Sequence, residues 1–230
     1  MQEKKIDRKL INELSKRIID VAREMFDSGL VVSTFGVVSA RIPETDYILI
    51  TPSGFSKAKL SPENLIIVNL KGELIEGNLR PSVETPMHTH IHMMRPDLEA
   101  VLHTHSPFAS AFAAANMEIP CILAEQAFYF GGRIPLVTNY SLPGTTNQAE
   151  LNSIVEALKY SNAILLRKHG VVSVGKTLEE ALDAAIVLED VAKITLLAML
   201  VSSPREFTNE EIEYLKEFKR TRYGQRRDSI

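Results

Sequence analysis

The feature that most constrains this chain is an apolar run that leads into two histidines, His103 and His105. The segment 101–105 reads Val-Leu-His-Thr-His and favours a β-strand. Residues two apart on a strand project from the same face, so both imidazoles are expected to point one way. Two rings directed at one point are half of a first-row metal site. Alone, the pair is also compatible with two ordinary, partly buried histidines.

A third histidine, His169, lies far along the chain in a similar setting. It follows the apolar run 163–166, which is typical of a strand, and precedes Gly170, where a turn is expected. Three neutral imidazoles together with a carboxylate such as that of Glu84 would suit zinc.

Composition narrows the class of protein. The chain has 230 residues, of which 45% are hydrophobic and 24% charged, enough for a substantial core. A net charge of -3 argues against a general nucleic-acid binder. The single cysteine, Cys121, excludes an internal disulfide and zinc sites built on several cysteines. With neither a signal peptide nor an apolar run of spanning length, we expect a cytoplasmic protein without a membrane partner.

Periodicity predicts alternating strands and helices around these histidines. Ser82 is expected to cap a helix that carries Pro86 in its first turn, with Glu84 near the helix N-terminus. The loop 51–55 could offer backbone N–H groups to an anion, although these residues alone favour a simple turn. The other expected helices cover residues 5–28, 107–116, 125–130, 146–160 and 177–201, with a last one from 208; the expected strands cover 31–42, 47–51, 66–70, 73–77, 134–137, 163–167 and 171–174.

The helix that follows Glu84 contains an alternative cluster. It carries His88, His90 and His92, of which His88 and His92 share a face and His88 lies one turn beyond Glu84. A Glu84–His88–His92 site is conceivable, but helical histidines more often pack or face solvent. The strand pair is therefore the preferred candidate.

The order of these segments resembles the class II aldolase/adducin family. The matching segments are 34–41, 49–54, 81–88, 101–105, Tyr140 with 143–145, and 165–170. The resemblance implies a single domain of α/β (α+β) type over residues 1–230, with a central, mostly antiparallel sheet flanked by helices. Its core would span about residues 10–200, followed by a C-terminal helix and basic tail at 204–230. It also implies a homotetramer with active sites between neighbouring subunits.

The same resemblance implies roles for individual residues. It makes His103, His105 and His169 the Zn2+ ligands, and Glu84 both a ligand and the catalytic carboxylate. Residues matched to the substrate phosphate are Gly36, Ser53, Gly54 and Ser82. Tyr223 matches a catalytic tyrosine of the aldolase tail that reaches a neighbouring subunit's site.

The sequence departs from the family pattern at several positions. Val37 replaces a phosphate-binding asparagine, and Val83 replaces the second serine of a pair. Ala124 aligns with a catalytic tyrosine of the aldolases, and the aspartate of the epimerase branch, near Phe128, is also absent. Candidates to replace these groups are Glu125, Tyr129 and Tyr140.

The expected activity is that of a zinc-dependent lyase acting on a phosphorylated sugar. It would cleave a ketose 1-phosphate, similar to fuculose 1-phosphate, into dihydroxyacetone phosphate and an aldehyde. A chelated divalent cation suits this chemistry because cleavage leaves negative charge on an enediolate. The alternatives are a related sugar-phosphate reaction, namely 4-epimerisation, decarboxylation or thiosugar-phosphate dehydration, and a non-catalytic, adducin-like interaction protein.

Overall fold

Eight strands form one sheet in the order β4-β3-β2-β1-β5-β8-β7-β6 in the computed structural model, which describes residues 7–223. All neighbouring strands are antiparallel except the parallel pair β6–β7. The strands are β1 (Val37–Arg41), β2 (Tyr47–Ile50), β3 (Ile66–Asn69), β4 (Leu74–Glu76), β5 (Ala100–Thr104), β6 (Leu136–Val137), β7 (Ala163–Leu166) and β8 (Gly170–Gly175). The predicted α/β fold with a mostly antiparallel sheet is confirmed.

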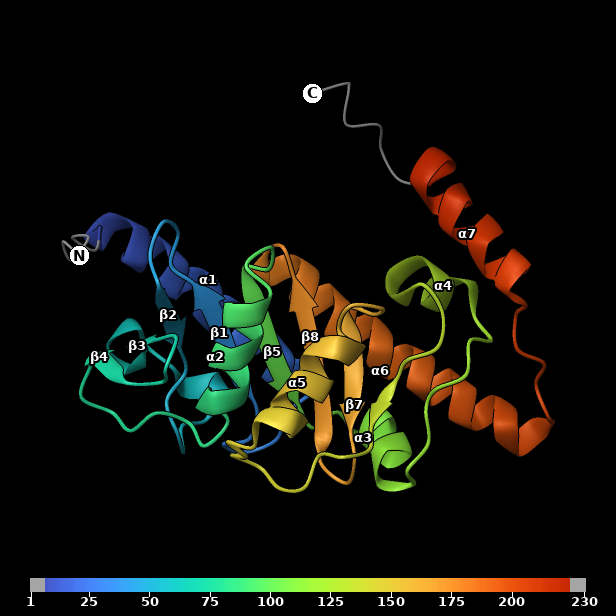
Figure 1. Ribbon diagram of the computed structural model, residues 1–230, viewed down its shortest axis with the longest axis horizontal. Coiled ribbons are helices and arrows are strands. Elements are labelled where there is room, and N and C mark those ends of the chain that lie inside the picture. Colours follow the sequence, from blue (N-terminus) through green and yellow to red (C-terminus); the bar gives the residue numbers. More distant parts are fainter. Residues whose placement is uncertain (1–6, 224–230) are drawn as a thin grey trace.

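Helices cover both faces of this sheet. In Figure 1, α2 and α5 lie on one face, and α1 and α6 lie on the other. The helix α7 packs against α4 rather than against the sheet. The helices are α1 (Arg8–Asp27), α2 (Thr85–Met94), α3 (Pro107–Ala114), α4 (Ala124–Phe130), α5 (Gln148–Ala157), α6 (Leu178–Val201) and α7 (Asn209–Arg222), with two 3-10 helices, η1 (Lys57–Lys59) and η2 (Pro62–Asn64).

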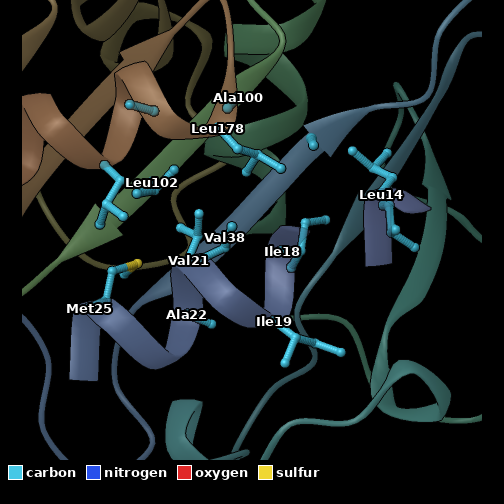
Figure 2. Close-up of a cluster of buried hydrophobic side chains, with 14 of the residues drawn as sticks. Leu14, Ile18, Ile19, Val21, Ala22, Met25, Val38, Ala100, Leu102 and Leu178 are labelled. Carbon is cyan, nitrogen blue, oxygen red and sulfur yellow. The ribbon is translucent and has the colours of Figure 1, made fainter. Parts of the chain in front are cut away.

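The amphipathic helix α1 closes one face of the sheet. Its apolar side, which includes Ile18 and Met25, packs on Val38 of β1, Leu102 of β5 and the start of α6 (Figure 2). Both helix residues are fully buried. A helix with a polar outer side gains most of its stability from burying such an apolar stripe.

The alternation of side chains along β5 directs His103 to the opposite face. Leu102 belongs to the core under α1, whereas Val101 belongs to the core under α2 and α5. His103, two residues after Val101, therefore projects on the α2 side of the sheet. The alternation thus places its ring beneath the helix that begins beside Glu84.

Two predicted boundaries were wrong in ways that bear on the site. The strand predicted over 31–42 begins only at Val37, because Ser33 and Gly36 have φ values of 56° and 82°, which a strand cannot accommodate. Ser82 does not cap α2: Glu84 occupies the N-cap, and the Ser82 hydroxyl accepts a hydrogen bond from the Glu84 N–H at 3.2 Å.

Across residues 7–223, the helices are each too short or too polar to traverse a lipid bilayer.

Truncation of a core side chain tests the packing of α1. Replacing Ile18 by alanine removes a fully buried side chain, so the free energy of unfolding should fall by about 2–5 kcal/mol. The exposed Lys16 on the same helix is the matched control, and Lys16→Ala should change stability by less than about 0.5 kcal/mol. Urea unfolding followed by circular dichroism measures both, and equal stabilities of the two variants would contradict the described core.

Candidate metal centre and adjoining cavity

Three histidines from two distant segments converge at one end of the central strands. His103 ends the apolar run of β5, His105 lies just beyond that strand, and His169 lies in the turn between β7 and β8. One ring nitrogen of each lies within 4.8 Å of those of the other two. His103 and His169 stack with ring centroids 4.7 Å apart, and the His105 ring stands edge-on to both.

A backbone hydrogen bond fixes which nitrogen His103 presents to this cluster. Its Nδ1 lies 2.8 Å from the carbonyl oxygen of Val171 in β8, so Nδ1 carries the hydrogen and donates it. That assignment leaves the lone pair on Nε2 of His103 free. This Nε2 lies 2.9 Å from the Nε2 of His105. A histidine whose other nitrogen donates to a backbone carbonyl is oriented and made more basic as a metal ligand.

Glu84 supplies the carboxylate expected at this centre. Its side chain is buried, and Oε1 lies 3.4 Å from Nε2 of His169. Within the described chain, Oε2 of Glu84 and Nε2 of His169 are buried and have no hydrogen-bond partner. Buried polar atoms without partners are costly, and a bound cation would satisfy both. Three imidazole nitrogens and one carboxylate oxygen thus fit a first-row divalent metal ion.

The surroundings of His103 and His105 keep these two imidazoles in their neutral form. Burial lowers the pKa of His105 to about 4, to which the neighbouring His169 contributes while Glu84 opposes it. Burial also lowers the pKa of His103, and the His169 and His105 rings add to that effect. Metal binding requires neutral imidazole, so at neutral pH these two rings are available without losing a proton first.

Close packing at Gly170 holds the three rings together. A Cβ atom at this position would lie 2.5 Å from the Thr104 carbonyl oxygen and about 3 Å from the His105 and His103 rings, at 3.1 and 3.2 Å. Only glycine leaves that space free, so the turn after His169 can approach the end of β5.

A cavity of about 290 Å³ opens onto the histidine cluster. Its walls include the predicted phosphate-binding residues Gly36, Ser53, Gly54 and Ser82, together with Glu84. The segments that carry them are brought together by an isolated bridge between Pro52 and Pro81 and by the hydrogen bond from the Ser53 N–H to the Arg80 carbonyl. The structure therefore gathers these predicted residues around a single cavity.

Tyr223 lies away from this cavity in the same chain. It follows α7 and its ring lies 5.6 Å from that of Phe128 on α4, with 62% of its surface exposed. Of the three candidates for the missing acid or base, Glu125 and Tyr129 also lie on α4. Residues 224–230 of the predicted basic tail lie outside the described part of the chain.

The alternative cluster on α2 is built differently. Both His88 and His92 bond to the hydroxyl of Ser39, at 2.7 and 3.0 Å, whereas His90 bonds to Asn152 on α5. Among the described residues, the only three-residue group whose atoms could hold a metal is His103, His105 and His169. The preference for the strand pair therefore agrees with the geometry.

Two aromatic residues lie at this centre: Tyr140, which was a candidate for the missing acid or base, and Phe35, which was given no role from the sequence. Phe35 stacks on the outer side of His105 with ring centroids 5.1 Å apart, and Tyr140 stacks on His169 at 5.4 Å. Tyr140 is 1% exposed, and burial together with the nearby Glu84 carboxylate raises the pKa of its hydroxyl. Both residues lie in segments that match the family, Phe35 in 34–41 and Tyr140 just before 143–145. Of the three candidates for the missing acid or base, Tyr140 is the one that contacts the histidine cluster.

Comparison with known proteins identifies the family. Residues 16–196 match the model of the class II aldolase and adducin N-terminal domain, and the chain belongs to this family. It is therefore placed among the enzymes of the class II aldolase/epimerase superfamily.

Curated relatives and a solved structure agree with this assignment. The chain is 32% identical over 220 residues to a probable L-ribulose-5-phosphate 4-epimerase UlaF of Mycoplasma pneumoniae, covering 90% of this chain and 91% of that protein. It is 33% identical over 196 residues to L-ribulose-5-phosphate 4-epimerase UlaF of Salmonella paratyphi C, covering 82% of this chain and 86% of that protein. The structure of an L-fuculose 1-phosphate aldolase matches with a TM-score of 0.84, covering 90% of this chain and 96% of that chain. Its sequence identity is 24%, so this match shows the fold alone.

The prediction of a ketose 1-phosphate aldolase is wrong in its choice of reaction. The curated relatives at about one-third identity are named as 4-epimerases, which favours that alternative over cleavage of a fuculose-1-phosphate-like substrate. The error has a chemical cause, because a metal-binding histidine cluster and a carboxylate suit both reactions.

Replacing Gly170 by alanine tests the packing of the cluster. The added Cβ displaces the Thr104 carbonyl and two imidazoles, so metal affinity should fall by at least about tenfold, and overpacking should lower stability by about 1–3 kcal/mol. Metal titration of the chelated protein and thermal unfolding measure the two effects.

Gly131→Ala is the matched control for Gly170→Ala. Its φ of 73° makes alanine strained, yet the nearest atoms lie 4.0 Å away and the residue is remote from the cluster. It should therefore lose stability but keep its metal. Equal metal affinities of the two variants would contradict the described packing.

Proposed function

We propose that this protein is a zinc-dependent 4-epimerase that inverts C4 of a ketopentose 5-phosphate of the L-ribulose 5-phosphate type. The observation that carries the proposal is the one-third identity to curated 4-epimerases over most of both chains. The histidine cluster, the buried carboxylate and the small adjoining cavity support it. Zinc is the proposed metal because its preferred ligands are three or four nitrogen, sulfur or oxygen atoms of this kind.

The chemistry of the substrate explains why a family that also cleaves carbon–carbon bonds can epimerise. The hydrogen on C4 is not acidic, because C4 is separated from the C2 carbonyl by C3. The C3–C4 bond can instead break, with its electrons passing into an enediolate while the C4 hydroxyl loses its proton and becomes an aldehyde. Turning that aldehyde over and reforming the bond inverts C4 and leaves the atoms balanced.

Each part of the site has a proposed role in this sequence. The metal, held by His103, His105 and His169, would supply a Lewis acid for the negative charge that develops on the substrate oxygens. Glu84 has a buried, unpartnered Oε2 that can accept a proton or ligate the metal. The walls that contain Gly36, Ser53, Gly54 and Ser82 would hold the phosphate, so that the aldehyde fragment stays bound while it turns.

A second acid or base is needed because the C4 hydroxyl loses its proton on one side of the site and, after the aldehyde has turned over, regains a proton on the other. Tyr223 remains the proposed residue for this role. Since it lies beside α4 and outside the cavity of its own chain, it would have to act on the site of a neighbouring copy. This requirement is consistent with the proposed homotetramer with sites between subunits.

A product panel tests the proposed reaction. Purified protein incubated with L-ribulose 5-phosphate should form its C4 epimer, D-xylulose 5-phosphate, and chelation followed by added zinc should abolish and restore this conversion. With fuculose 1-phosphate, no dihydroxyacetone phosphate should be released. Release of that product without any pentulose interconversion would overturn the proposal.

Removing the charge of Glu84 tests its role. Glu84→Gln keeps the shape of the side chain but cannot accept a proton, so kcat should fall by about 10²–10⁴-fold. Metal content should stay close to stoichiometric, because three imidazoles remain. His90→Gln is the control, since His90 contacts Asn152 and does not line the cavity, and it should retain turnover. Unchanged turnover in Glu84→Gln would remove Glu84 from the mechanism.

A further inference from the structure

Lys57 in η1 is a buried cation beside the candidate site. It is 1% exposed, and lysine is rarely buried to this extent without a charged partner. Its Nζ donates hydrogen bonds to the carbonyl oxygens of Phe55 at 3.0 Å and Thr34 at 3.2 Å. Both partners are neutral backbone groups, so hydrogen bonding alone leaves the positive charge of Lys57 uncompensated.

The two carbonyls bonded by Lys57 belong to the two loops that line the cavity. Thr34 precedes Phe35 and Gly36 in one wall, and Phe55 follows Ser53 and Gly54 in the other. Lys57 itself does not line the cavity. Its ammonium group therefore lies behind both loops and fastens one to the other, with the oxygen ends of two peptide dipoles turned toward it.

The charge of the cavity wall is otherwise unsuited to a phosphoryl group. The wall contains the Glu84 carboxylate, and none of the described residues that line it is a lysine or arginine. A sugar phosphate brings close to two negative charges into this partly enclosed space. Burial lowers the pKa of Lys57 to about 8, so the amine is still mostly protonated at neutral pH. Attraction between charges is stronger inside a protein than in water, so a cation behind the wall still acts on an anion in front of it.

We propose that Lys57 is the positioning residue of the phosphate subsite, where it fastens the loops around Thr34 and Phe55 together and supplies the positive charge that the lining lacks. The identity of the anion as a sugar phosphate rests on the proposed function. The role of Lys57 itself concerns phosphate affinity and does not depend on which reaction follows.

The competing explanation is that Lys57 serves only to hold η1 and its neighbouring loops in the fold. The two explanations differ in what they predict for a neutral replacement. A purely structural lysine would change stability, metal content and turnover together. A lysine that serves the phosphate subsite would change phosphate affinity and KM while leaving kcat and the metal in place.

The test measures phosphate binding directly on the zinc-loaded full chain. Lys57→Met keeps the aliphatic stem and removes the charge, and Lys59→Met is the matched control because Lys59 lies exposed in the same 3-10 helix. Calorimetry with inorganic phosphate and steady-state kinetics with L-ribulose 5-phosphate are run on both variants and the wild type. Zinc content and thermal unfolding are recorded for each protein.

We expect Lys57→Met to bind inorganic phosphate about tenfold or more weakly and to raise KM by a similar factor, with kcat within about threefold of wild type. Lys59→Met should match the wild type in every measurement. If Lys57→Met does not fold, Lys57→Gln, which keeps N–H donors without the charge, takes its place with the same expected loss.

Equal phosphate affinity and KM in the wild type and the neutral variant would overturn the inference, as would a joint loss of zinc and kcat. Failure of the wild type to bind phosphate would also overturn it. A wild-type chain that binds phosphate through Lys57 but does not interconvert pentulose phosphates would instead refute the proposed function and leave the role of Lys57 standing.

Discussion

The hydrogen bond from His103 Nδ1 to the Val171 carbonyl is the interaction on which the candidate site depends. It joins β5 to β8 at the end of their ladder and leaves the other nitrogen of His103 directed at His105 and His169. The two strands can come this close because residue 170 is a glycine. A Cβ atom there would clash with the Thr104 carbonyl oxygen and crowd the His103 and His105 rings. Backbone pairing and ligand geometry are thus set by the same few atoms at the centre of the sheet.

Several parts of this arrangement could be predicted from the sequence because they follow from short-range periodicity. Alternation along a strand predicted that His103 and His105 project from one face, and the helical spacing of apolar residues predicted a helix over 5–28, where α1 lies. The convergence of His169 with that pair could not be derived from spacing alone. It depends on β8 pairing with β5, a long-range contact that the family segments indicated and periodicity did not.

What the sequence did not predict lies mainly in the loops. The positive φ values of Ser33 and Gly36 make β1 begin later than its apolar pattern suggests, and the loop before the strand brings Phe35 against His105. The burial of Lys57 depends on two loops that meet only in the folded chain. The choice between cleavage and epimerisation was missed for a different reason: the residues that could hold a metal suit both reactions, so the distinguishing groups lie elsewhere.

The antiparallel pairing of β5 with β8 also has a consequence for the order of events during folding. His103 and Val171, whose hydrogen bond orients the cluster, are separated by 68 residues along the chain, so the ligands come together only when the centre of the sheet has formed. Contacts of such long range form late and slowly. A metal ion that binds only the completed cluster therefore stabilises the native state by mass action, and the free metal concentration would set part of the protein's resistance to unfolding.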